Sequence, residues 1–124
     1  MPSPARHLSG AAELVREFNH SSRSTKADWE FPNASYSALG NLSSLVGMLP
    51  QALEQSIRPV MHTYEHGRVK IDGNGDPDAA VRHLRDALGR AVRAASELTE
   101  AVSQMHSETS PMGLDTTGLP GFAD

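Results

Sequence analysis

Two histidines and a glutamate in the segment HTYEH have the spacing of a metal site. His62 and His66 are four residues apart, so on a helix they lie on one face, about one turn from each other. Two such imidazoles can bind one Zn²⁺ ion, and Glu65 beside them matches the general base of the H-x-x-E-H zinc proteases. A protease of that kind needs a further acidic ligand much later in the chain, and no Glu follows Glu108. The pattern therefore predicts at most a simple zinc site in which His83 is the third ligand. If no metal binds, the two histidines are ordinary exposed side chains at the end of a helix.

The next segment, DGNGDPD, contains the ligand types of a calcium-binding loop. Asp72, Asn74 and Asp76 match positions one, three and five of an EF-hand loop. Position six should be Gly and is Pro77, and position twelve should be Glu and is His83, so these ligands cannot enclose the ion. Asp76 is also a favourable helix N-cap, and proline suits the first helical position. We therefore interpret the segment as a connection between two helices and predict no cofactor.

Four arginines between positions 82 and 93 form a third candidate site, because a basic helix can follow the phosphates of a nucleic acid. The chain as a whole has a net charge of −4 at pH 7, which disfavours a nucleic-acid partner. Acidic residues lie among the arginines, and a solvated helix face explains them equally well. An accessory nucleic-acid-binding protein of a mobile element or phage is kept as an alternative. The arginines are Arg82, Arg85, Arg90 and Arg93.

No other arrangement in the sequence predicts catalysis. No serine lies in a G-x-S-x-G elbow, and no Gly-rich phosphate loop with its lysine is present. We therefore expect a non-enzymatic protein.

The C-terminal half shows the clearest helical pattern. Apolar or alanine positions recur at steps of three and four, which predicts a helix over residues 77–106 with one apolar seam. The seam consists of Val81, Leu84, Leu88, Ala91, Ala95, Leu98, Val102 and Met105.

A second apolar seam runs through residues 35–66. Pro50 and Pro59 interrupt it, because a proline inside a helix removes a hydrogen bond and pushes against the preceding turn. We predict either one kinked helix or two shorter helices that meet near Pro50, ended by Gly67 in a left-handed conformation. The short connection to the next helix would let the two fold back on each other as an antiparallel hairpin.

Residues 34–53 carry no charged side chain, and several small residues lie close together there. Small residues allow a second helix to approach closely, and an uncharged circumference indicates burial on more than one face. We expect the cover to come from a short helix over residues 9–19 or from a second molecule. The predicted interaction surface consists of Ala38, Gly40, Ser43, Ser44 and Gly47.

The predicted fold class is all-α, with a long antiparallel helical hairpin and a short N-terminal helix that complete a four-helix bundle by dimerisation. The domain division is a short helix and irregular segment over residues 1–34, the hairpin over 35–107 and a flexible tail over 108–124. In the irregular segment, Trp29 and Phe31 are expected to pin the chain onto the bundle.

Composition narrows the cellular setting. The 124 residues contain no cysteine, so disulfides and thiolate chemistry are excluded. The N-terminus lacks the apolar core of a signal peptide, and no run is long and apolar enough for a membrane span. We expect a soluble, cytoplasmic protein without membrane contact. Export by a pathway that needs no signal peptide is kept as an alternative.

In helix length, small uncharged packing surface and loose tail, residues 35–107 resemble the small WXG-type proteins of type VII secretion. The W-x-G motif itself is absent, because the one tryptophan lies in Trp29-Glu30-Phe31, ahead of the hairpin. The resemblance implies helical hairpins that pair, with themselves or with a relative, into four-helix bundles. The leading hypothesis is therefore an interaction or adaptor protein that forms a homodimer or binds another helical protein. A metal- or small-ligand-binding bundle that uses His62, His66 and His83 is the second hypothesis.

Overall fold

The computed structural model describes residues 3–23 and 29–118, and the described residues form helices and no strand. The all-α prediction is therefore confirmed at the level of class. The helices, in chain order, are α1 (Ala5–Ser21), α2 (Pro32–Gly47), α3 (Leu49–Ser56), α4 (Arg58–Glu65) and α5 (Pro77–Thr109).

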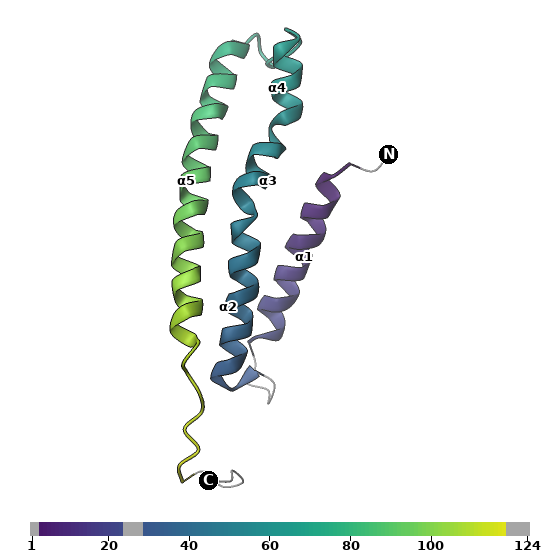
Figure 1. Cartoon of the computed structure of the whole chain (residues 1–124). Coiled ribbons are helices and arrows are strands. Elements are labelled where there is room, and N and C mark those ends of the chain that lie inside the picture. The colour runs from purple at the N-terminus through teal and green to yellow at the C-terminus, as the bar shows by residue number, and fades with distance from the viewer. Residues whose placement is uncertain (1–2, 24–28, 119–124) are drawn as a thin grey trace.

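Helices α2, α3 and α4 follow one another as a single kinked rod (Figure 1). The breaks fall at Met48 and Ile57, each two residues before a proline. Pro50 and Pro59 lack the amide hydrogen that would continue the helical ladder, and their rings crowd the turn before them. Helical bonding resumes at once, since the amide of Ala52 donates to Met48 at 3.1 Å. The predicted interruption near Pro50 is present, and Pro59 causes a second one.

Helix α5 begins where its sequence predicts. The Asp76 side chain accepts a hydrogen bond from the amide of Asp78 at 3.0 Å, and Pro77 occupies the first helical position. Asp78 adds a negative charge at the positive end of the helix. The helix continues through Thr109, three residues beyond the predicted end at His106.

The chain reverses direction between α4 and α5. Gly67 and Gly73 have φ of 66° and 75°, and Asn74 has φ of 60°, conformations that glycine and asparagine adopt at low cost. The Tyr64 hydroxyl donates to the Asp78 carboxylate at 2.6 Å, which ties the end of α4 to the start of α5. The rod of α2 to α4 therefore runs antiparallel to α5, and the two lie side by side (Figure 1).

The core between the rod and α5 is narrow. Among the described residues, only Val46 of α2 and Val81, Ala95 and Val102 of α5 are buried hydrophobics. None of the described large side chains is fully buried. These short side chains let the two helices approach closely, and the other large apolar residues of the rod and α5 are half-buried or exposed.

Helix α1 lies along the rod on the side away from α5 (Figure 1). It is longer than the predicted range of 9–19, yet no Cα atom of α1 comes within 8 Å of a Cα atom in another helix. Phe18 meets Trp29 edge to face, with ring centroids 5.5 Å apart. Trp29 thus contacts α1. The apolar side chains Leu8 and Leu14 remain 54% and 66% exposed, so α1 covers the rod only loosely.

No helix in the described part of the chain combines the length and the apolar character that crossing a membrane requires.

Candidate interaction surface

The histidine pair lies at the end of α4 and the turn that follows. The rings of His62 and His66 are 4.6 Å apart, as their spacing predicts. The His66 Nδ1 atom lies 2.8 Å from the carbonyl oxygen of His62, so this nitrogen is already engaged with the backbone. No group of three or more His, Cys, Asp or Glu side chains among the described residues is placed to hold a metal ion, and His83 therefore does not complete a site.

The four arginines of α5 are exposed. At about 100° per residue, Arg82, Arg85, Arg90 and Arg93 extend over about 140° of the helix circumference. Asp86 and Glu100 lie within the same arc. This mixture is typical of a solvated helix face and does not form a uniform basic stripe.

Three of the five predicted interaction residues face α5 of the same chain. The Ser43 hydroxyl lies 2.9 Å from the Ser103 hydroxyl. A Cβ atom at Gly40 would lie 3.0 Å from the His106 Nε2 atom, and one at Gly47 would lie 3.9 Å from a methyl carbon of Thr99. The small residues thus permit the close approach that the sequence indicates, and α5 is the helix that approaches them.

The other two predicted residues point elsewhere. Ser44 is exposed, and its hydroxyl donates to the backbone carbonyl of Gly40 at 3.3 Å. Ala38 lines an apolar groove between α1 and α2 with a volume of about 350 Å³. The groove is lined by Ala11, Leu14, Val15, Phe18 and Asn19 of α1 and by Ala38, Asn41, Leu42 and Leu45 of α2.

Sequence reasoning missed an aromatic contact at the end of this packing face. The Tyr36 and His106 rings stack with centroids 4.3 Å apart. Tyr36 lies four residues before Gly40 and seven before Ser43, so the helical repeat that places these two against α5 also places Tyr36 there.

The largest difference from the sequence prediction concerns the apolar seam of α5. Ala95 and Val102 are buried against the rod, but Leu98 and Met105 are 47% and 52% exposed. Leu98 and Met105 lie about 60° around the helix from Ala95 and Val102, which turns them away from the rod. We name this side of the helix the open α5 face. It consists of eight residues, of which the first four are half-buried and the last four are exposed: Ala80, Leu84, Ala87, Ala91, Ala94, Leu98, Ala101 and Met105.

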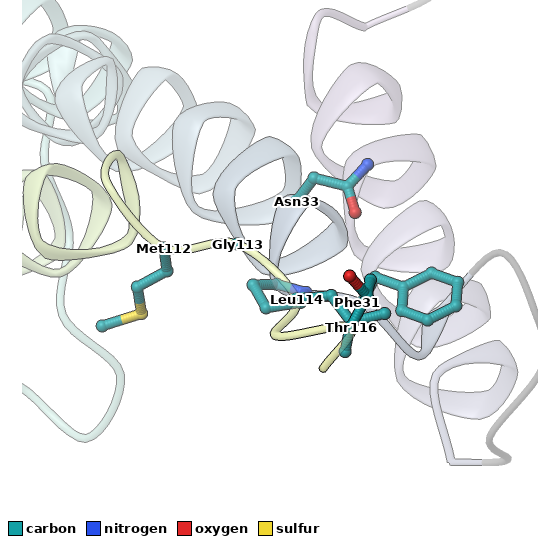
Figure 2. Close-up of a pocket in the computed structure, with 7 residues that line it drawn as sticks. Phe31, Asn33, Met112, Gly113, Leu114 and Thr116 are labelled. Carbon is teal, nitrogen blue, oxygen red and sulfur yellow. The ribbon is translucent and has the colours of Figure 1, made fainter. Parts of the chain in front are cut away.

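A second hollow lies where the chain leaves α5 and passes the start of α2. Its volume is about 320 Å³, and it is lined by Phe31, Pro32, Asn33, Met112, Gly113, Leu114 and Thr116. Figure 2 shows Met112 and Leu114 on the segment that follows α5, with Asn33 on the first turn of α2. The lining has no acidic, basic or histidine side chain, so this hollow offers no acid–base chemistry.

The chain matches no protein-family model, no curated protein and no solved structure.

Proposed function

We propose that this is a non-enzymatic helical interaction protein that works by associating with a second helical chain, either its own copy or another helical protein. In this proposal the antiparallel α2–α5 hairpin supplies half of a four-helix bundle. The observation that supports it is the apolar surface left open along α5, where Leu98 and Met105 are about half exposed.

The total surface of the chain supports the same proposal. Its accessible area is 9,762 Å². A compact monomer of 13.3 kDa is expected to expose about 6,450 Å², from the scaling of area with mass. The excess of roughly 3,300 Å² exceeds the roughly 800 Å² that each partner buries in a standard interface. The elongated helical pair, the loosely packed α1 and the non-helical segment after α5 explain part of this excess, and association would bury a further part of it.

The test compares the unaltered protein with Leu98→Glu, which places a charge on the open α5 face. Ser96→Glu is the matched control, because Ser96 is exposed on the opposite edge of the same helix. Light scattering across a wide concentration range measures self-association, and affinity purification from the native cells measures other partners. We expect association in the unaltered protein and in Ser96→Glu, and its loss in Leu98→Glu. A monomer that captures nothing beyond what Leu98→Glu captures would contradict the proposal.

A further inference from the structure

We infer that the partner is a second copy of the chain, which docks with its α5 antiparallel to the first α5 across a two-fold axis near residue 93. The inference rests on the proposed function and specifies which chain binds and in which orientation. The contact would be the open α5 face of each copy. Figure 1 shows α1 on the far side of the rod, so α1 leaves this face free.

The first argument for this geometry is the order of side chains along the open α5 face. The eight positions repeat at steps of four and three, the heptad spacing of packed helices. In an antiparallel pair of these faces, each residue of one copy meets a residue of the other, and the contacts form four kinds of layer. In three of the four, a small residue meets a large one, which lets the side chains interlock. The layers pair Ala80 with Met105, Leu84 with Ala101, Ala87 with Leu98, and Ala91 with Ala94. Each pair of numbers is centred between residues 92 and 93.

The charges of α5 give the same orientation. Residues 80–93 contain four arginines and Asp86, a net charge of +3, whereas residues 94–109 contain three glutamates and no Lys or Arg, a net charge of −3 with His neutral. In the described part of the chain, none of these groups forms an ion pair. Of these charges, only Arg90, Glu97 and Glu108 flank the open α5 face, and the others lie on the far side of the helix. An antiparallel second copy brings opposite charges together along this edge. In the proposed register, Arg90 at the edge of the face approaches Glu97 of the second copy.

The proposed contact extends along the whole of α5. The change of charge falls between residues 93 and 94, and the midpoint of α5 (Pro77–Thr109) is residue 93, so this register also overlaps the two helices along their full length. The face from Ala80 to Met105 is roughly 38 Å long at 1.5 Å per residue.

Helix α2 adds little apolar surface here, because Leu42 already lines the groove against α1. One helix with its side chains is roughly 10 Å wide, so each copy would offer roughly 380 Å² along α5, which is typical of a small interface that associates weakly.

Orientation is tested by placing one spin label in the otherwise cysteine-free chain. The variant Glu108→Cys places the label near the end of α5. An antiparallel dimer separates the two labels by 31 residues of helix rise, roughly 45 Å, as measured by pulsed electron spin resonance. A parallel dimer brings them to roughly 10–20 Å from each other. A short distance would overturn the inference and leave the proposed function standing.

Charge exchange tests the register in the unlabelled full chain. Arg90→Glu and Glu97→Arg should each raise the dimer dissociation constant roughly ten-fold, and the double variant should restore it, because both symmetric pairs re-form with their signs exchanged. The matched control exchanges Arg93 and Glu100, which lie away from the open α5 face. Equal effects in both sets, or no rescue, would overturn the inference. A monomer that binds a different partner would overturn it too, whereas loss of all association would count against the proposed function itself.

Discussion

Gly40 of α2 faces the His106 ring of α5, so the effect of adding a side chain there can be measured. Alanine at an open helical glycine is expected to stabilise a helix by roughly 0.5–1 kcal/mol, as we predict for Gly89→Ala, which meets only the tip of the Arg93 side chain. Gly40→Ala should stabilise the protein less than Gly89→Ala does, by at least about 0.5 kcal/mol in the free energy of unfolding, because the Cβ of Gly40→Ala crowds the His106 ring. Urea denaturation measures both. The difference should vanish in a His106→Ala background, and a difference that persists there would contradict the contact.

Tyr64 has a hydrogen-bond partner on the next helix. The hydrogen bond to Asp78, helped by desolvation, raises the pKa of Tyr64 above its ordinary value of 10.0. Because the folded pKa is raised, the stability from this bond is fully present below the unfolded pKa and is lost as pH rises through the folded pKa. In Tyr36→Phe, where Tyr64 is the only tyrosine, alkaline absorbance titration should give a lower pKa once Asp78→Asn is added. An unchanged pKa would show that the bond is absent in solution.

At the scale of elements, α1 differs from the other long helices. A helix of 17 residues is marginal in water unless packing supports it, and α1 has no buried residue. We expect amides in α1 to exchange hydrogen orders of magnitude faster than amides near Val81, Ala95 and Val102 in α5. Mass-spectrometric exchange on peptides from both helices measures this. Protection of α1 equal to that of α5 would show that a neighbour covers its exposed leucines.

The sequence predicts the helices of this chain better than it predicts their neighbours. Caps and prolines act within a few residues, so the start of α5 at Pro77 and the break near Pro50 follow from local rules. Whether Leu98 faces α2 or water depends on the rotation of α5 about its axis. That rotation is fixed by contacts between distant residues, such as Ser43 with Ser103. A continuous seam of three and four steps contains no signal for dividing its members into buried and exposed residues.

At the scale of the whole molecule, the narrow core and the open α5 face together make a prediction about stability. If folding and association are coupled, each tenfold rise in protein concentration stabilises the folded dimer by about 1.4 kcal/mol through mass action. Because the unfolding entropy is that of both chains, the thermal midpoint should then rise by roughly 3–5 °C per tenfold. Leu98→Glu should unfold at a lower temperature that does not depend on concentration, whereas Ser96→Glu should behave like the unaltered protein. Circular dichroism melts from about 1 to 100 µM measure this, and a midpoint independent of concentration in the unaltered protein would mean that Val46, Val81, Ala95 and Val102 hold the fold without a second copy.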